Sequence, residues 1–281
     1  MTAVGLVVSH DPGAAAGLAI ELTEWLTGEG HDVVLVDADA EVTGLAGLGR
    51  DPTDFARGLE LAVCLGGDGT MLRTVGLVHR HDVPVLGINV GTLGYLTEVE
   101  AGAARQALAR FFAGDFEVED RMMVQASIDG VDEVVSGLNE VTVEKTPTSH
   151  TVKLSVYLHD EFFTTYVADG IIVATPTGST AYSFSARGPI VTPTHRLLVV
   201  TPVAPHMLFD RVLVLSPDDH VRMVVEGTRP ALVSVDGRQR AVLGEGDVVT
   251  CTAAPTSTRL VRLGNRTFHG ILKSKFGLND R

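Results

Sequence analysis

Cysteine is scarce in this sequence of 281 residues, which contains only Cys64 and Cys251. Both lie inside short aliphatic runs of the kind that form buried strands. Two isolated thiols provide neither a disulfide framework nor a cysteine-based metal site, so we expect two buried free thiols. The ten histidines are scattered without metal-ligand spacing, and no zinc site is predicted.

Long hydrophobic runs are also missing. Residues 1–9 show no basic region ahead of a sustained apolar stretch, so they do not resemble a secretory signal. Apolar runs elsewhere, such as Leu197–Val200, are too short to span a bilayer. We therefore expect a cytoplasmic protein that is not exported and has no membrane partner.

Positive charge is the third scarce feature. The formal net charge is −13, and no cluster of Lys and Arg appears along the chain. Affinity for a nucleic-acid backbone comes from such clusters, so we expect no nucleic-acid partner. An acidic protein that binds a polyphosphate needs a divalent cation to offset its own field, and Mg²⁺ becomes the expected cofactor.

Several familiar active-site signatures are absent. The sequence contains no Gly-x-x-x-x-Gly-Lys-Ser/Thr loop, no Gly-x-Gly-x-x-Gly fingerprint and no Gly-x-Ser-x-Gly elbow. These absences argue against the usual P-loop, dinucleotide-binding and serine-hydrolase sites. Any phosphate chemistry must therefore use a different glycine-rich turn.

What the first part of the chain does contain is an alternation of short aliphatic runs and longer helical stretches. We expect strands at residues 4–8, 33–36, 61–65 and 85–88, and helices at 14–26, 71–79 and 103–112. This alternation predicts an α/β N-terminal domain with a parallel sheet, over residues 1–118. Residues 42–50, rich in glycine, are expected to form a loop.

The second part of the chain has a different texture, with many short strand-like segments and few helical intervals. Such a series predicts an all-β, sandwich-like C-terminal domain over residues 119–264. The tail, residues 265–281, is amphipathic, and we expect it to pack back on the first domain.

The segment Gly66-Gly67-Asp68-Gly69-Thr70 follows the strand predicted at residues 61–65. Its glycines allow consecutive backbone amides to converge on an anion, and Thr70 is expected to cap the helix that follows. Asp68 would then lie where phosphate chemistry takes place. The alternative is a tight turn in which Asp68 bonds its own backbone.

A second loop, Gly87–Leu96, leaves the next predicted strand. Parallel strands end at the same edge of a sheet, so this loop and Gly66–Thr70 are expected to meet over one crevice. Tyr95 and Leu96 could flank a planar base, or they could be ordinary core residues.

Asn139 and Glu140 stand at the start of another predicted strand. An amide beside a carboxylate can hydrogen-bond two neighbouring hydroxyls, as on a ribose. A turn residue followed by a solvated glutamate is the simpler interpretation.

The segment Asp169–Ser185 is richer in chemistry. A carboxylate precedes a buried strand, which leads into a hydroxyl-rich Pro/Gly turn that is expected to open a helix near Ser179 or Thr180. The start of such a helix would bind phosphate or a polar base edge. N-capping by Ser179 or Thr180 is the simpler alternative, but it accounts for only one of the many hydroxyls.

Taken in order, these motifs resemble those of the NAD kinases. The resemblance covers about residues 60–240 and rests on Gly66–Thr70, Gly91–Tyr95, Asn139-Glu140, Asp169-Gly170 and Thr175–Tyr182. Diacylglycerol, sphingosine and phosphofructo-kinases carry relatives of the first motif, so the later motifs single out the family. The resemblance implies phosphorylation of the adenosine-ribose 2′-hydroxyl of NAD by ATP or another polyphosphate, with a divalent metal.

The resemblance also implies roles for individual residues. Asp68 would be the general base, and Asn139 and Glu140 would bind ribose hydroxyls of NAD. Tyr95 and Leu96 would lie near the adenine, and Asp169 near the nicotinamide half. The remaining implied substrate-binding residues are Gly69, Arg73, His150, Thr180, Ala181, Tyr182, Ser185, His206 and Arg238.

Two positions depart from the family pattern. Arg187 stands where a glycine is common, and Arg238 follows Asp236-Gly237 where a glutamine is frequent. Both departures add positive charge near a proposed anion site. Members of the family are homodimers or homotetramers with shared active sites, which implies the same for this chain.

Two other functions remain open at this point. A lipid kinase of the diacylglycerol kinase type shares the glycine-rich loop, but it should show a membrane-facing apolar or basic patch, which the sequence lacks. A dinucleotide-binding sensor that has lost catalysis would keep the fold, although Asp68 is intact.

Overall fold

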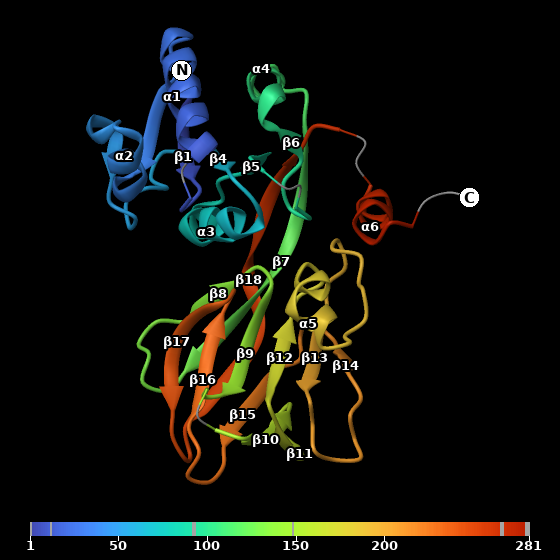
Figure 1. Ribbon diagram of the computed structural model, residues 1–281. Helices are drawn as coiled ribbons and strands as arrows, with labels where there is room; N and C mark the ends of the chain where they lie inside the picture. Colours follow the sequence, from blue (N-terminus) through green and yellow to red (C-terminus); the bar gives the residue numbers. More distant parts are fainter. Residues whose placement is uncertain (1, 12, 92–93, 148, 265–266, 279–281) are drawn as a thin grey trace. The chain divides into compact units, whose positions relative to one another are not determined.

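The structure is a computed structural model that describes residues 2–11, 13–91, 94–147, 149–264 and 267–278. The chain divides into two compact units, residues 1–120 with 258–281, and residues 121–257. The chain crosses from one unit to the other within two long strands, β7 (Glu117–Ile128) and β18 (Val248–Arg262) (Figure 1). The predicted division kept residues 258–264 in the second domain. They belong to the first unit because Leu260 of β18 pairs in parallel with Val85.

The first unit contains a parallel sheet. Its strands are β1 (Ala3–Val8), β2 (Asp32–Val36), β3 (Gly49–Arg50), β4 (Leu61–Leu65), β5 (Val85–Asn89) and β6 (Val99–Glu100). The order across the sheet is β18-β5-β4-β1-β2-β3, every neighbouring pair is parallel, and β6 also pairs with β5. The predicted α/β class with a parallel sheet is confirmed.

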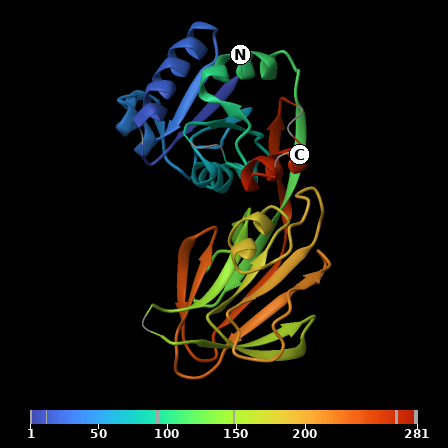
Figure 2. The same cartoon turned by 45° about the vertical axis from the view of Figure 1, so that its right-hand side comes forward.

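Helices flank this sheet (Figure 2). The helical segments are α1 (Gly13–Gly28), α2 (Asp37–Thr43), η1 (Ala46–Leu48), α3 (Asp68–Val78), η2 (His79–His81), η3 (Ala101–Ala103), α4 (Ala104–Phe112) and α6 (Phe268–Phe276). Helices α1 and α4 share one apolar cluster with alternate residues of β1 and β4, such as Leu6 and Val63. Met71 of α3 instead packs against Gly87 of β5, in the space that a Cβ at that position would occupy. Of the described helices, none is both long and apolar enough to cross a membrane.

The expectation of a loop over residues 42–50 is wrong. Helix α2 extends to Thr43, and the short elements η1 and β3 follow it. Gly44 adopts φ 76° and donates its N–H to carbonyls of the last helical turn. Glycine therefore ends a helix here and does not mark a long loop.

The second unit is built from two antiparallel layers. One layer contains β7, β8 (Val135–Gly137), β10 (Val152–Leu158), β11 (Glu161–Ala168), β15 (Val221–Val225) and the first part of β18. The other layer contains β9 (Glu140–Lys145), β12 (Gly170–Ala174), β13 (Leu198–Val203), β14 (Leu213–Leu215), β16 (Ala231–Val235) and β17 (Arg238–Leu243), in the order β14-β13-β12-β9-β16-β17. Between β12 and β13 lie η4 (Gly178–Thr180) and α5 (Tyr182–Ser185). The predicted sandwich-like class is confirmed.

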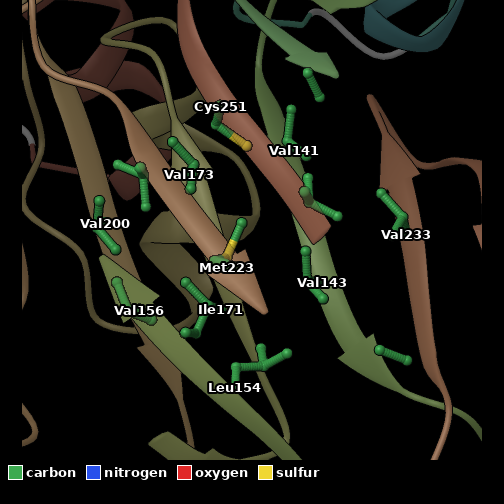
Figure 3. Close-up of a cluster of buried hydrophobic side chains, with 14 of the residues drawn as sticks. Val141, Val143, Leu154, Val156, Ile171, Val173, Val200, Met223, Val233 and Cys251 are labelled. Carbon is green, nitrogen blue, oxygen red and sulfur yellow. The ribbon is translucent and has the colours of Figure 1, made fainter. Parts of the chain in front are cut away.

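The core of this unit lies between the two layers, as Figure 3 shows. Val141 and Val143 of β9 alternate with polar neighbours and meet Leu154 of β10 in one buried cluster. Alternation with period two is what places one face of each strand inside. Cys251 belongs to this cluster, and Cys64 is buried in the first unit, so the expected two buried free thiols are confirmed. Burial raises the pKa of each thiol to about 12.

The tail forms α6, which belongs to the first unit. Thr267 caps this helix by accepting a hydrogen bond from the Gly270 N–H at 3.1 Å. The Lys275 ammonium lies 5.4 Å from the centroid of the Tyr95 ring. This cation–π contact holds the tail near the loop that follows β5.

Candidate active site

In the first unit, the glycine-rich turn lies where the strand order of the sheet reverses. From β1 the chain continues to β2 and β3 on one side, whereas β4 and β5 lie on the other. Ligands of parallel sheets bind at the carboxyl ends of the strands at this kind of reversal. Gly66 follows β4 there and donates its N–H to the Ile88 carbonyl of β5 at 3.0 Å. The sequence therefore folds its glycine-rich turn into the expected ligand position of the sheet.

Helix α3 begins directly after this turn. Gly67 occupies the N-cap position, and among the described residues no side chain caps the helix. The expectation that Thr70 is the cap is wrong, because the helix begins at Asp68 and Thr70 is its third residue. The N–H groups of the first turn of this helix of 11 residues carry no side-chain cap, which suits them to an anion.

Asp68 joins the two predicted loops. Its Oδ2 accepts the Tyr95 N–H at 2.9 Å, and its Oδ1 accepts the Leu96 N–H at 3.0 Å. A Cβ on Gly94 would lie 2.0 Å from Oδ1, so only glycine allows this approach. Asp68 thus binds a loop 27 residues away and not its own turn. Each carboxylate oxygen keeps a further lone pair for a ligand.

Arg73, an implied substrate-binding residue, has its guanidinium in a buried ion pair. One nitrogen lies 2.5 Å from Asp39 Oδ1, and another donates to the Val8 carbonyl at 2.9 Å. Asp39 Oδ2 in turn accepts the Val8 N–H at 2.8 Å. These contacts tie α3 to α2 and to the end of β1. Substrate contact by Arg73 stays a prediction.

Tyr95 and Leu96 differ in exposure. Leu96 is buried, whereas Tyr95 is partly exposed. Burial, and then the charge of Asp68, raise the pKa of Tyr95. The core interpretation therefore fits Leu96, and Tyr95 remains the residue of this pair that a ligand could reach. Residues 92 and 93 of the same loop lie outside the described residues.

In the second unit, Glu140 is a buried carboxylic acid at the start of β9. Its residue is 6% exposed, and its Oε2 has no hydrogen-bond partner among the described residues. It receives one hydrogen bond from the Tyr182 N–H. Burial and then the negative charge of Asp236 raise its pKa to about 8. The interpretation of Glu140 as a solvated residue is therefore wrong.

Asn139 is held from both sides by its backbone. Its carbonyl accepts the Thr175 N–H at 2.8 Å, and its N–H donates to Asp236 Oδ1 at 2.8 Å. A Cβ on Gly178 would lie 2.1 Å from the Asn139 carbonyl oxygen, so glycine is required at that point of the turn. The turn after β12 therefore packs directly on the Asn139–Glu140 pair and is hydrogen-bonded to it.

The hydroxyl series after β12 builds this turn. Thr175 Oγ1 donates to the Leu138 carbonyl at 2.6 Å, and Ser179 Oγ donates to the Pro176 carbonyl at 2.7 Å. Thr177 Oγ1 accepts from Arg121 at 3.2 Å. The expected helix near Ser179 is only the single 3₁₀ turn η4 followed by the four residues of α5. Neither Ser179 nor Thr180 caps η4 or α5, so the N-capping alternative is wrong. The hydroxyls of Thr175 and Ser179 bond backbone carbonyls within and beside the turn, and Thr177 is bonded by the Arg121 side chain.

Two further polar pairs lie in the second unit. The Tyr182 hydroxyl donates to Glu144 Oε1 at 2.6 Å, and Lys145 Nζ lies 2.8 Å from Asp169 Oδ1. Burial, then the bond to Glu144, raise the pKa of Tyr182 well above its usual value. Asp169 and Tyr182 were singled out from the sequence, whereas Glu144 and Lys145 were missed. The alternation along β9 was the only available signal for them.

The remaining implied ligands differ in accessibility. Ser185, His150, His206 and Arg238 are exposed, whereas Thr180 and Ala181 are partly buried. The Thr180 hydroxyl donates to the Thr177 carbonyl at 3.2 Å. The backbone of His206 is fixed by its amide N–H, which donates to the Val167 carbonyl at 2.7 Å. Their binding roles stay predictions, as does that of Gly69.

A metal site made of protein groups alone is not found in the described ranges, since no three His, Cys, Asp or Glu side chains gather to hold an ion. Mg²⁺ is commonly held by one or two carboxylates together with substrate phosphates. The open lone pairs of Asp68 beside the start of α3 fit such a shared site.

Comparison with known proteins gives a consistent family. Residues 49–116 match the ATP-NAD kinase N-terminal domain, and residues 138–263 match the ATP-NAD kinase C-terminal domain. An NAD kinase of Heliobacterium modesticaldum is 41% identical over 98% of this chain and 98% of its own length. NAD kinase 1 of Streptomyces coelicolor is 37% identical over 99% of this chain and 86% of its own length.

Two solved structures share the fold. Yeast NADH kinase, solved with NADH, has a TM-score of 0.89 over 100% of this chain and 89% of its own, at 24% identity. An NAD kinase of Archaeoglobus fulgidus, solved with ATP, has a TM-score of 0.77 over 100% of both chains, also at 24% identity. These findings support neither the lipid-kinase nor the sensor alternative.

Proposed function

The chain belongs to the NAD kinase family, and from this premise we propose that it transfers the terminal phosphoryl group of ATP to NAD. The acceptor is the 2′-hydroxyl of the adenosine ribose, and the product is NADP. The observation that carries the proposal is the placement of Asp68 between two glycine-rich loops at the reversal point of the sheet.

The first unit offers the features that a polyphosphate needs. The turn at Gly66–Gly67 leads into α3 without a side-chain cap, which leaves backbone donors and the positive end of the helix dipole for phosphate oxygens. The formal charge of −13 works against a polyanion over long distances. Local backbone donors and a divalent cation therefore have to provide the attraction.

The second unit offers the features that a ribose needs. Asn139 and Glu140 are adjacent, their backbone is fixed, and Glu140 Oε2 is buried with no hydrogen-bond partner in the part of the chain that the structure describes. A buried polar atom of this kind is costly unless a ligand or water satisfies it. The hydroxyls of a ribose are suitable partners, because each can donate and accept.

Asp68 acts as the general base in this proposal. It accepts the proton of the 2′-hydroxyl while that oxygen bonds to the γ-phosphorus and the bond to the ADP oxygen breaks. An ordinary carboxylate is a weak base for an alcohol, but in a loose transition state the proton moves late and orientation matters most. The N–H groups of Tyr95 and Leu96 supply that orientation.

Mg²⁺ is proposed as the cation, held by the nucleotide phosphates with Asp68 as the protein carboxylate nearest the turn. When bound, it neutralises charge that develops on the transferred phosphoryl group. A cytoplasmic location and a homodimer or homotetramer with shared active sites are further predictions from the resemblance.

The test is direct. Purified protein is incubated with NAD, ATP and Mg²⁺, and NADP is measured with a dehydrogenase that uses only NADP. Parallel reactions with inorganic polyphosphate or NADH establish donor and acceptor preference. We expect NADP with ATP. No NADP with any donor or divalent metal would contradict the proposal, and NAD binding without turnover, seen by calorimetry, would favour a sensor.

A further inference from the structure

Asp236 occupies the two-residue hairpin turn between β16 and β17. Asp236 has φ 48° and Gly237 has φ 72°, the left-handed angles that a tight hairpin turn requires. Aspartate and asparagine tolerate this conformation better than most residues. The turn alone would therefore explain an Asp-Gly pair at this point.

The carboxylate of Asp236 does more than form a turn. Its oxygens accept three consecutive backbone N–H groups, from Leu138 at 2.8 Å, Asn139 at 2.8 Å and Glu140 at 3.2 Å. The Asp236 N–H returns a bond to the Glu140 carbonyl at 3.0 Å. A Cβ on Gly137 would lie 2.9 Å from Asp236 Oδ1. The lack of a side chain at Gly137 therefore allows the Asp236 carboxylate to approach this backbone segment.

The other side of the same segment is held by the turn after β12. The Leu138 carbonyl accepts the Thr175 hydroxyl at 2.6 Å, and the Asn139 carbonyl accepts the Thr175 N–H at 2.8 Å. Residues 138–140 are thus bonded from two sides: their three N–H groups donate to Asp236, and the carbonyls of Leu138 and Asn139 accept from Thr175. Backbone held in this way fixes the direction in which the side chains of Asn139 and Glu140 leave the chain.

We propose that Asp236 is a positioning residue of the dinucleotide site, which holds the Asn139 and Glu140 side chains in their binding orientation through three backbone N–H groups. This inference rests on the proposed function, because it assumes that Asn139 and Glu140 contact NAD. Asp236 itself needs no contact with the substrate.

The charge of Asp236 has a second effect on Glu140. After burial, Asp236 is the next cause of the raised pKa of Glu140, and Glu144 adds a smaller repulsion. The pKa of Asp236 is itself raised, because burial outweighs the three N–H bonds and the attraction of Arg238. Removing the charge at position 236 lowers the pKa of Glu140 and moves any pH dependence of NAD binding to lower pH.

The variant Asp236→Asn tests the proposal. Asparagine keeps the turn conformation and the size of the side chain, but it loses the charge and one of the two acceptor oxygens. We expect the KM and the calorimetric Kd for NAD to rise by about tenfold to a hundredfold, because the contact geometry is lost. The KM for ATP is expected to change less than about twofold, since the proposed contacts of ATP, the phosphoryl donor, do not involve residues 138–140.

The matched control is Asp160→Asn, in the β10–β11 hairpin turn of the same unit. Asp160 also has a positive φ, 65°, and it is exposed, with contacts to His220 and Arg222. We expect NAD binding by this variant to equal that of the parent. Backbone hydrogen exchange at residues 138–140, measured without substrate, should be faster in Asp236→Asn only.

The outcomes separate cleanly. Unchanged NAD affinity and unchanged pH dependence in Asp236→Asn would overturn the positioning role, even if the variant were less stable to heat. A parent that binds NAD without phosphorylating it would contradict the proposed function, while the comparison of Kd values would still decide this inference. A parent that does not bind NAD would overturn both.

Discussion

Replacing Glu140 by glutamine should make the protein more stable at alkaline pH. Glu140 is 6% exposed, and its pKa is raised from 4.5 to about 8 by burial and by the charge of Asp236. Below pH 4.5 the carboxyl is protonated in both the folded and the unfolded chain, and it adds no pH dependence. Between pH 4.5 and 8 the unfolded chain releases this proton while the folded chain keeps it, so the free energy of unfolding falls.

The size of the effect follows from the same values. The gap between 4.5 and about 8, at about 1.4 kcal/mol per pH unit, corresponds to about 5 kcal/mol lost by pH 8 and above. Glutamine cannot ionise, and it can still accept the Tyr182 N–H. The stability difference between Glu140→Gln and the parent is therefore expected to be smallest at pH 5 and to grow to several kcal/mol at pH 8.

Urea unfolding at pH 5, 6, 7 and 8 measures this difference. Circular dichroism follows the secondary structure of both units, and the fluorescence of Trp25, the only tryptophan, reports the first unit. Recording both shows whether the two units unfold together. The control is Glu133→Gln, the same exchange at an exposed position in the second unit. If the difference in the free energy of unfolding between Glu140→Gln and the parent did not change with pH, the claim that Glu140 is a buried carboxyl that keeps its proton would be refuted.

Two further predictions concern buried contacts. Asp39→Asn breaks the pair with Arg73 and leaves that guanidinium buried without its counter-charge, so urea unfolding should show a loss of about 3 to 5 kcal/mol; a loss below about 1 kcal/mol would mean that the pair stabilises little. Gly178→Ala places a Cβ 2.1 Å from the Asn139 carbonyl oxygen, so the KM for NAD should rise about tenfold while the KM for ATP stays nearly constant. Equal changes in both constants would show that the turn does not act on the dinucleotide selectively.

The fold could be predicted where short-range patterns decide it. Alternation of aliphatic runs and helical stretches identified the parallel sheet, and the series of short strands identified the sandwich. The error at residues 42–50 arose because Gly44 ends a helix, and a glycine at the end of a helix looks locally like a loop glycine. The prediction that Thr70 caps α3 was wrong for a related reason. Gly67 occupies the N-cap position, so the helix begins at Asp68, before Thr70.

The site was predictable in its motifs and not in its long-range partners. Asp68, Asn139 and Glu140 stand in recognisable local patterns. The partner of Arg73 is 34 residues away, and Asp236 reaches N–H groups 96 to 98 residues before it. Sequence spacing carries no signal for such contacts, because strand order and turn geometry bring them together. For the same reason Asp236 was noted only as the neighbour of Arg238.

The measurement that tests the central claim most directly compares the parent with Asp68→Asn for NADP formation from NAD and ATP. Asparagine can keep an acceptor oxygen for the loop at Tyr95 and Leu96, but it cannot take the proton of the hydroxyl. We predict that kcat falls by about a hundredfold to ten-thousandfold while the Kd for NAD changes less than about tenfold. Thermal unfolding of both proteins controls for loosening of the loop. An Asp68→Asn variant that forms NADP at the parental rate would contradict the role of Asp68 and the account of catalysis built on it.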